Sequence, residues 1–283
     1  MNIFGLASQC IERGKPCALI TVIRTSGSVP RHEGAKMLVA ADGAILGGTV
    51  GGGEMESRAI QLAQQAITTG QTRTVSYQLA DLAKGDPGVC GGTVELFIEP
   101  LLPAPTLLIV GAGHVGRALT HLAKWCGFRV VVSDDRAELC TPEQCPGADT
   151  YLPGPLRARL AEMPLTPQTY VALVTRGYPI DVDALPVLLD SPVAYIGVIG
   201  SQRRWLTAAK VLRERGVSDA ALQRVRAPIG LELNAETPEE IAVSIMAEII
   251  MQRRGGHGRP MSEEGDREWE AGRVDDRRLE MGH

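Results

Sequence analysis

The sequence predicts an α/β protein in which an N-terminal α+β domain precedes a Rossmann-like domain with a doubly wound parallel sheet. In the first third of the chain, short strand patterns follow one another through turns, and only two helices are expected. From residue 106 onward, apolar strands alternate with helices, which is the pattern of a parallel sheet. A loop at 111–116, with glycine at its first, third and sixth positions, joins a strand to a helix in this second region. A length of 283 residues is enough for two such domains.

The first domain is expected to span residues 1–102. Its helices are predicted from the amphipathic spacing of apolar residues, and Asp42-Gly43 is a tight hairpin signal between two strands. We expect helices at 2–13 and 54–67, and strands at 17–24, 35–40, 44–46, 72–79 and 93–99. The linker that follows is marked by Pro100, Pro103 and Pro105.

The second domain is expected to span residues 106–254. Its last helix has a strong start signal, because Thr237 can cap it, Pro238 suits the first helical position and Glu240 can complete a capping box. We expect strands at 106–110, 128–133, 170–175 and 193–199, and helices from the 111–116 loop to about 127 and at 181–190, 201–215 and 237–254. Residues 255–283 are rich in Gly, Glu and Arg without apolar periodicity, which predicts a disordered tail.

Composition and charge exclude several classes of function. A net charge of −4 argues against a nucleic-acid-binding protein. No segment approaches the roughly 18 consecutive apolar residues of a membrane span, and the N-terminus carries no signal-peptide pattern, so we expect a cytoplasmic protein that does not bind membranes. The six cysteines form no CxxC pair, so neither a disulfide framework nor a zinc site is indicated.

Cys90 is the first candidate for chemistry. It lies in the segment 85–92, which has almost no side-chain bulk, and Gly91 and Gly92 follow it directly. Glycines let the backbone turn freely and let another molecule approach closely, so the thiol would be accessible to a ligand. The alternative is a tight turn that happens to contain a small residue.

Two other loops of the first domain are suited to an anionic ligand. Gly51, Gly52 and Gly53 come directly before a predicted helix, which makes a candidate anion cradle, and Glu54 at the start of that helix is a candidate cofactor contact with them. The alternative is simple helix initiation, since Glu54 and Glu56 in the first turn suit the helix dipole. The loop at 25–31 offers groups suited to a phosphate and to polar ring atoms, although a hairpin loop rich in Ser and Gly is also consistent with it. These groups are Ser26, Ser28 and Arg31, with Lys36 shortly after.

The second domain carries a dinucleotide-binding fingerprint. Gly111, Gly113 and Gly116 permit a tight turn, backbone approach to a pyrophosphate and close helix–strand packing. Asp134 ends the next strand, where an acid can bind a ribose 2′-hydroxyl. Arg136 nearby could instead bind the 2′-phosphate of NADP, so a phosphorylated ribose is also compatible with the sequence. The domain is therefore expected to bind NAD(P) or another nucleotide, unless its glycines now serve packing alone.

Other residues of this domain are placed near the same crevice. His114, beside a helix N-terminus, is expected to be neutral and either to hydrogen-bond a ligand or to face solvent. The strand ends at 175–177 and 199–201 should open onto the crevice. Arg203 and Arg204 follow and could meet anionic groups, or one of them could lie on a solvated helix face.

Taken together, these motifs resemble the XdhC/CoxI family, the accessory proteins of xanthine dehydrogenase and related molybdenum hydroxylases. In the first domain the resemblance rests on residues 25–31, 34–37, 48–54 and 89–92, and in the second on 111–116, 199–201, 228–231 and 237–242. It covers about residues 1–254 in family order. Asn234 stands where a glycine is expected and Arg204 where a lysine is expected, so fine details of the second crevice differ.

The resemblance implies a chaperone for the molybdenum cofactor (molybdopterin) rather than an enzyme with its own turnover. Such a protein holds the cofactor while a cysteine desulfurase installs its sulfido ligand, and then delivers it to apo-xanthine dehydrogenase or a related hydroxylase. Cys90 would contact molybdenum through the cofactor, because a soft thiolate suits molybdenum and sulfur chemistry. We expect the protein to work as a homodimer.

Two alternatives remain. The 111–116 loop and Asp134 would also suit an NAD(P)-dependent oxidoreductase, although no Tyr/Lys or His/Asp proton-transfer pair is evident near the crevice. Cys90 could instead be a covalent sulfur carrier, since a thiolate is the attacking species in such transfers, but the sequence shows no general base beside it.

Overall fold

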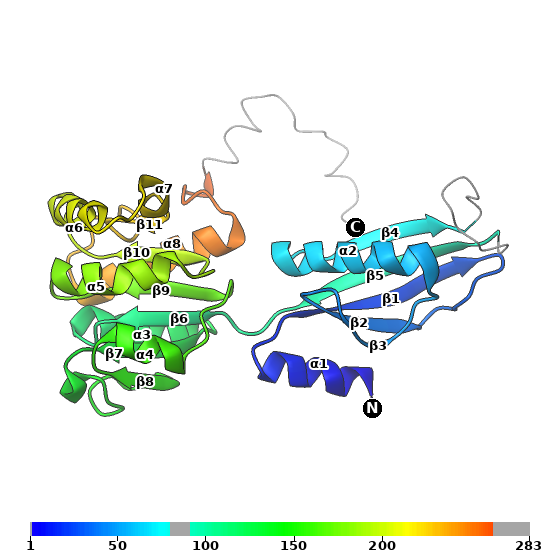
Figure 1. Cartoon of the computed structure of the whole chain (residues 1–283), viewed down its shortest axis with the longest axis horizontal. Coiled ribbons are helices and arrows are strands. Elements are labelled where there is room, and N and C mark those ends of the chain that lie inside the picture. The colour runs from blue at the N-terminus through cyan, green and yellow to red at the C-terminus, as the bar shows by residue number, and fades with distance from the viewer. Residues whose placement is uncertain (1, 80–90, 263–283) are drawn as a thin grey trace, which may run out of the picture. The chain divides into compact units, whose positions relative to one another are not determined.

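The structure, a computed structural model, describes residues 2–79 and 91–262 (Figure 1). The chain divides between Ala104 and Pro105 into two compact units, and each is described by itself. Over the described ranges, no helix has the length and apolar character that a membrane crossing requires. The same ranges contain no group of three or more His, Cys, Asp or Glu side chains that could hold a metal ion.

The N-terminal unit is one antiparallel sheet with a helix on each face. The strand order is β3-β2-β1-β5-β4. The strands are β1 (Cys17–Ser26), β2 (Lys36–Ala40), β3 (Ile45–Gly48), β4 (Arg73–Gln78) and β5 (Thr93–Leu101), and the helices are α1 (Ile3–Glu12) and α2 (Gly53–Thr69). Successive side chains of a strand point to opposite faces. Ile20 therefore packs in the core under α2, while Cys17 and Leu19 pack under α1.

The C-terminal unit is a six-stranded parallel sheet in the order β11-β10-β9-β6-β7-β8. Its strands are β6 (Thr106–Val110), β7 (Arg129–Asp134), β8 (Thr150–Pro153), β9 (Thr169–Leu173), β10 (Tyr195–Val198) and β11 (Val225–Arg226). In chain order this is the 3-2-1-4-5-6 arrangement of a doubly wound sheet, and the order reverses between β6 and β9. Ligands of such folds bind beyond the carboxyl ends of the strands at that reversal.

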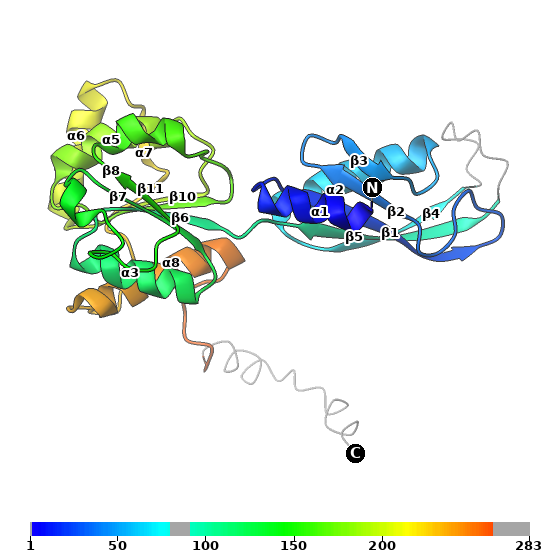
Figure 2. The same ribbon diagram turned by 90° about the horizontal axis from the view of Figure 1, so that it is seen from below.

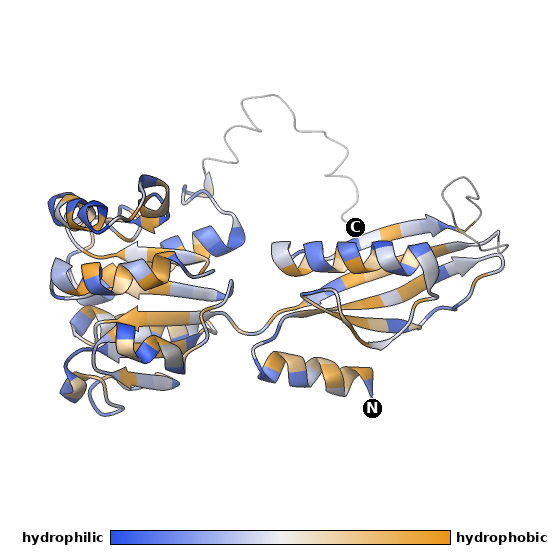
Figure 3. Cartoon of the chain, viewed as in Figure 1, coloured by the Kyte–Doolittle hydropathy of each residue, from blue (hydrophilic) through white to orange (hydrophobic). Residues whose placement is uncertain are grey.

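Helices cover both faces of the parallel sheet (Figure 2). On one face lie α3 (His114–Trp125) and α8 (Pro238–Arg254), and on the other α4 (Leu156–Arg159), α5 (Tyr178–Leu189) and α6 (Gln202–Glu214). A short helix, α7 (Asp219–Leu222), precedes β11. Because both faces are covered, the central strand β6 is apolar along its length, as its orange colour in Figure 3 shows.

The predicted fold class is confirmed, and four differences have local causes. β8 and β11 are edge strands of four and two residues, too short to show a strand pattern in the sequence. Pro100 belongs to β5 rather than to the linker; it lies beyond Ile98, where the pairing with β4 ends. α5 begins at Tyr178, earlier than the predicted 181, because Pro179 suits the first turn of a helix. Asn234 has a φ of 51°, a left-handed conformation that asparagine tolerates, which explains why it can replace a glycine.

Candidate cofactor-binding site

In the N-terminal unit, the fold brings the 25–31 loop against Gly91 and Gly92. A Cβ atom on Gly92 would lie 2.3 Å from the carbonyl oxygen of Ser28 and 2.7 Å from that of Ser26. Gly27 has a φ of 72°, and a Cβ there would lie 3.0 Å from the Cα of Gly92. Bare backbone therefore faces bare backbone, and these glycines are required for the two segments to meet.

The 25–31 loop is held in shape by a carboxylate that follows it. The backbone N–H of Thr25 donates to Glu33 Oε1 at 2.7 Å, and its hydroxyl donates to the same oxygen at 2.6 Å. The hydrogen bond from the Thr25 hydroxyl lowers the pKa of Glu33 below its usual value. The loop is thus closed by its own side chains, which leaves its other polar groups available.

The predicted ligand groups of this loop are exposed. Ser26, Ser28 and Arg31 are all solvent-exposed, and none of their side chains makes a hydrogen bond or ion pair within 2–79 and 91–262. Lys36 differs, because it is partly buried on β2 and its Nζ donates to Thr21 Oγ1 at 3.2 Å. Three of these four predicted groups therefore have no side-chain partner among the residues that the structure describes.

The glycine loop before α2 lies beside the 25–31 loop, since a Cβ on Gly51 would lie 2.6 Å from Pro30 Cγ. The expectation that Gly51, Gly52 and Gly53 form an anion cradle for a ligand stays a prediction, because in this structure a carboxylate of the protein itself lies in the loop. Glu56 fills it: this carboxylate accepts hydrogen bonds from three groups of the loop. The donors are Thr49 Oγ1 (2.7 Å), Val50 N (3.2 Å) and Gly52 N (3.1 Å).

The sequence indicates only a helix-initiating role for Glu56, whereas Glu54 is also a candidate cofactor contact. Burial acts to raise the pKa of Glu56, but its hydrogen bonds outweigh burial and hold the pKa below its ordinary value. Glu54 is exposed on the first turn of α2, and its contact with a cofactor stays a prediction. Cys90 lies outside the described residues, so its role stays a prediction; Gly91, next to it, is exposed.

In the C-terminal unit, the three glycines of the 111–116 loop are glycines for different reasons: two are fixed by close packing and one is not. A Cβ on Gly116 would lie 1.9 Å from the carbonyl oxygen of Gly111, and one on Gly111, whose φ is 116°, would lie 2.6 Å from that of Val174. Gly113 has a φ of −72° and nothing within 4 Å of its Cβ position. Packing therefore accounts for Gly111 and Gly116, whereas the bare backbone at Gly113 leaves room for a ligand at the start of α3.

Asp134 is placed at the end of β7 as predicted, but the protein itself satisfies its oxygens. It accepts hydrogen bonds from the backbone of Ala112 at 2.8 Å and from two guanidinium nitrogens of Arg136 at 3.0 Å. Burial acts to raise the pKa of Asp134, and these hydrogen bonds lower it to a net value below the usual range. A second pair, Arg176 with Asp135 at 2.6 Å, lines the same crevice, whose volume is about 10 Å³. That volume admits about one water molecule.

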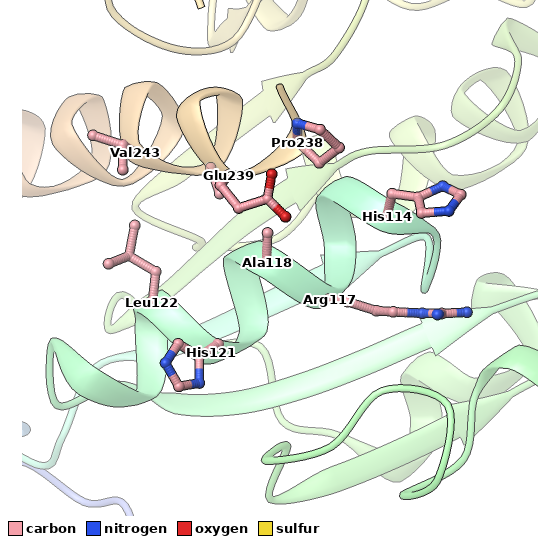
Figure 4. Close-up of a pocket in the computed structure, with 9 residues that line it drawn as sticks. His114, Arg117, Ala118, His121, Leu122, Pro238, Glu239 and Val243 are labelled. Carbon is pink, nitrogen blue, oxygen red and sulfur yellow. The ribbon is translucent and has the colours of Figure 1, made fainter. Parts of the chain in front are cut away.

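His114 lies at the first position of α3, where its exposed side chain lines a groove between α3 and α8 rather than the crevice beside Asp134 (Figure 4). Arg117 and His121 of α3 and Glu239 of α8 line the same groove, whose volume is about 440 Å³. Of the two roles expected for His114, a solvent-facing side chain fits its exposure, and a contact with a ligand stays a prediction.

Buried polar clusters that the sequence did not reveal hold the crevice together. Asp181 is fully buried and accepts hydrogen bonds from Thr175 Oγ1 at 2.5 Å and from Arg204 at 2.6 Å. Arg204 thus meets an anionic group of the protein, while Arg203 is exposed. Burial raises the pKa of Asp181. In the sequence, the one sign that Asp181 has a special role is its position as an acidic residue in the first turn of a helix.

A second cluster attaches the 228–231 segment to α8. Glu248 is buried and accepts hydrogen bonds from the Tyr195 hydroxyl at 2.5 Å and from the Gly230 backbone at 2.6 Å. A Cβ on Gly230 would lie 2.3 Å from Ser244 Oγ, so the glycine is required for this close approach. The motif at 228–231 therefore has a structural role.

An antiparallel sheet with a glycine-rich loop cluster, followed by a parallel sheet with a modified dinucleotide crevice, defines a two-domain α/β protein with a Rossmann-like second half. A family model described as the XdhC Rossmann domain matches residues 107–249, just over half of the chain, and a model described as the XdhC and CoxI family matches residues 10–78. The chain belongs to the XdhC/CoxI family.

Three curated relatives are similar to this chain. An uncharacterized protein, YqeB of Escherichia coli (strain K12), is 35% identical over 260 residues, which cover 91% of this chain and 47% of YqeB. A Bacillus subtilis (strain 168) protein, named as a probable xanthine dehydrogenase subunit, is 33% identical over 162 residues, 57% of this chain and 47% of that protein. The molybdenum cofactor insertion chaperone PaoD of Escherichia coli (strain K12) is 24% identical over 287 residues, 89% of this chain and 88% of PaoD.

The matched regions span about half the length of the first two relatives. Among solved structures, a Bacillus halodurans protein described as a xanthine dehydrogenase is 24% identical, with a TM-score of 0.49 over 90% of this chain and 96% of that one.

Proposed function

We propose that this protein is a molybdenum cofactor chaperone, which binds the cofactor at the loop cluster of its N-terminal unit and delivers it to a hydroxylase of the xanthine dehydrogenase class. The observation that carries the proposal is the packing of the 25–31 loop on Gly91 and Gly92, which leaves Ser26, Ser28 and Arg31 exposed and unpaired within the described ranges. The printed names of PaoD and of the Bacillus subtilis relative support the same role.

The exposed groups suit the cofactor as cargo. A guanidinium can bind a phosphate through two parallel hydrogen bonds, and hydroxyls can donate to the same oxygens or to a pterin ring. The bare backbone at Gly91 would let the pterin approach closely. Cys90, next in the sequence, is proposed to contact molybdenum as a soft thiolate. In this proposal the cofactor is sulfurated by a cysteine desulfurase while it is held.

A carrier must also release its cargo. A micromolar dissociation constant corresponds to about −8 kcal/mol, and a tenfold loosening requires only about 1.4 kcal/mol. Loss of one hydrogen bond to a charged group, about 1.5–3 kcal/mol, would be enough. Docking of the client hydroxylase near the 25–31 loop could therefore release the cofactor by displacing Arg31 alone.

The test is retention of molybdenum cofactor by the full chain after size exclusion, measured as molybdenum and pterin per protein. Wild type should retain the cofactor. Cys90→Ala and Arg31→Ala should each lose about tenfold or more in affinity. Cys126→Ala is the matched control, because Cys126 is a partly exposed free cysteine at the end of α3.

The outcomes separate the parts of the proposal. No retention by wild type would refute cofactor binding. Equal retention by wild type and Cys90→Ala would refute the ligand role of that thiol and leave the loop groups to be judged from Arg31→Ala. Activation of apo-xanthine dehydrogenase by the loaded protein, with and without a desulfurase, then tests delivery and sulfuration.

The two alternatives need separate measurements. A persulfide on Cys90 after incubation with a desulfurase and cysteine, seen by mass spectrometry, would support the sulfur-carrier hypothesis. Titration with NAD and NADP tests the oxidoreductase hypothesis, which the geometry does not favour because both carboxylate oxygens of Asp134 accept hydrogen bonds from the Arg136 guanidinium.

A further inference from the structure

A groove on the C-terminal unit has two unlike walls, one basic and one acidic. It runs between α3 and α8, and its volume is about 440 Å³. His114, Arg117 and His121 line it from α3, at spacings of three and four residues that place them on one side of that helix. Glu239 lines it from α8 (Figure 4). Groups of opposite character therefore face a space large enough for side chains of another molecule.

The floor of the groove is apolar. Ala118 and Leu122 of α3 are partly buried there. Ala242 of α8 is buried, and Val243, next to it, is 50% exposed. Trp125, 83% exposed, lies about one turn beyond Leu122 on the same side of α3. An apolar strip with polar groups on either side is the arrangement that binds one face of an amphipathic helix.

The basic groups of the α3 wall are not neutralised within the part of the chain that the structure describes. Arg117 donates to two uncharged acceptors, the carbonyl oxygen of Ala112 at 3.4 Å and the amide oxygen of Gln144 at 3.2 Å. His114 and His121 are exposed and make no hydrogen bond or ion pair to a described residue. A guanidinium is always charged, and an imidazole has at least one N–H to donate. The α3 wall therefore has unused donors for carboxylates.

The α8 wall limits what else the groove can bind. Glu239 is exposed and makes no hydrogen bond or ion pair within residues 2–79 and 91–262. Its neighbour Glu240 is already used, because it accepts from the backbone of Glu236 at 2.9 Å and of Thr237 at 3.0 Å. An acidic side chain on this wall repels a ligand that is acidic on all sides. An occupant that fits both walls is therefore acidic only along the flank that faces α3.

The groove is elongated along the two helices. His114 and Pro238 lie at one end and Leu122 and Val243 at the other, so α3 and α8 begin at the same end (Figure 4). The stretch of α3 from His114 to Leu122 spans about 12 Å, and Trp125 extends it to about 16 Å. The apolar residues of a bound helix at i, i+4 and i+7 would cover about 10 Å of that length.

We propose that this groove binds an amphipathic helix of a partner protein, with the apolar ridge of that helix on the floor and its acidic flank toward Arg117 and the two histidines. The occupant is acidic on that flank because carboxylates complement the unpaired donors of α3. Such complementarity chiefly decides which partner binds and in which orientation. Two or three helical turns bury less than the roughly 1,200 Å² of a stable interface, so a transient complex with a Kd of about 10–100 μM is expected.

The test is fluorescence anisotropy of labelled synthetic peptides titrated with the full chain. The acidic peptide is an amphipathic helix of about 15 residues, with Leu at every third or fourth position and Glu along one flank. Its twin has Lys in place of each Glu. Wild type should bind the acidic peptide at about 10–100 μM and the twin at least about tenfold more weakly. Binding requires no molybdenum cofactor, so its failure leaves the proposed function untouched.

Substitutions on the α3 wall locate the binding. Arg117→Glu and His121→Glu should each weaken the acidic peptide about tenfold, because each replaces an attraction by a repulsion. The double variant should prefer the Lys twin. Lys210→Glu, on the exposed face of α6, changes the net charge as Arg117→Glu does and should leave both affinities unchanged. Tryptophan fluorescence confirms that each variant is folded, and His121→Glu at its exposed position keeps the test decisive if Arg117→Glu does not fold.

Several outcomes would overturn the proposal. These are no binding of the acidic peptide by wild type, equal binding of the two peptides, and an affinity that neither Arg117→Glu nor His121→Glu lowers. Binding that appears only after residues 263–283 are removed would assign the groove to the chain's own C-terminal segment, where 263–270 holds five acidic residues. Dissociation of a dimer by the peptide, measured by sedimentation velocity, would assign it to a second copy. Either result would exclude a partner helix as the occupant.

Discussion

Glu56 organises the glycine loop beside the proposed cofactor site, and its removal should open the start of α2. Its carboxylate receives one short hydrogen bond, from Thr49 at 2.7 Å, and two longer ones, from Val50 and Gly52 at 3.2 and 3.1 Å. Hydrogen bonds to a charged group contribute about 1.5–3 kcal/mol, and less when they are long or partly solvated. Taking about 1.5 kcal/mol for the first and about 0.5 for each of the others gives about 2.5 kcal/mol.

We predict that Glu56→Ala lowers the free energy of opening the first turns of α2 by about this amount, which corresponds to roughly 60-fold faster amide exchange. Hydrogen exchange with mass spectrometry of the full chain measures it, because peptides from α2 report the N-terminal unit alone. Glu54→Ala is the matched control: Glu54 is exposed in the same helical turn and should cost less than about 1 kcal/mol, the worth of a charge near a helix end.

The pH dependence of the same exchange has a definite sign. The folded pKa of Glu56 lies below its unfolded value of about 4.3, so its stabilisation is complete above that pH and is lost as the pH falls through the folded pKa. The difference between wild type and Glu56→Ala should shrink below about pH 4. Equal exchange rates for Glu56→Ala and Glu54→Ala at neutral pH would refute the reasoning.

Two further predictions concern the C-terminal unit. Gly113→Ala should change stability by less than about 1 kcal/mol, whereas Gly116→Ala, whose Cβ would lie 1.9 Å from a carbonyl oxygen, should cost several times more; similar urea midpoints for both would contradict the conclusion that packing requires Gly116 but not Gly113. Asp181→Ala should lower the free energy of unfolding by about 3 kcal/mol, because it leaves Arg204 without its buried counter-charge. Asp183→Ala, at an exposed position of the same helix, is the control and should lower it by less than about 0.5 kcal/mol. Tryptophan fluorescence in urea measures both variants, and equal effects would show that the buried pair contributes no stability.

The elements predicted well were those with strong periodic or capping signals. The helix after Thr237 has the predicted capping box, with Thr237 Oγ1 accepting from the backbone of Glu240 and Glu240 accepting in return. β6 and the helix after the 111–116 loop lie where the pattern placed them. Such signals are local, so they can be recognised without knowing what lies across the fold.

The candidate site was predicted less completely, because its chemistry depends on distant partners. The glycines before α2 resemble an anion cradle until Glu56, a helical turn later, is seen to fill it. Asp134 resembles a ribose ligand until the side chain of Arg136 is seen on both of its oxygens. In each case the sequence identifies a group that can bind an anion or a hydroxyl, and only side-chain geometry decides that the protein's own residues bind it.

The amino-acid sequence by itself determined the two-unit α/β architecture, the order of its main strands and helices, and the family, because hydrophobic periodicity, glycine placement and helix caps act over a few residues. Only the tertiary structure decided which loops meet: Gly92 and the 25–31 loop come from different ends of the first unit's sequence, and the pairing of β1 with β5 brings them together. It also decided which polar groups are bound inside the protein and which remain exposed. Both depend on contacts between residues far apart in the chain, which no local pattern records.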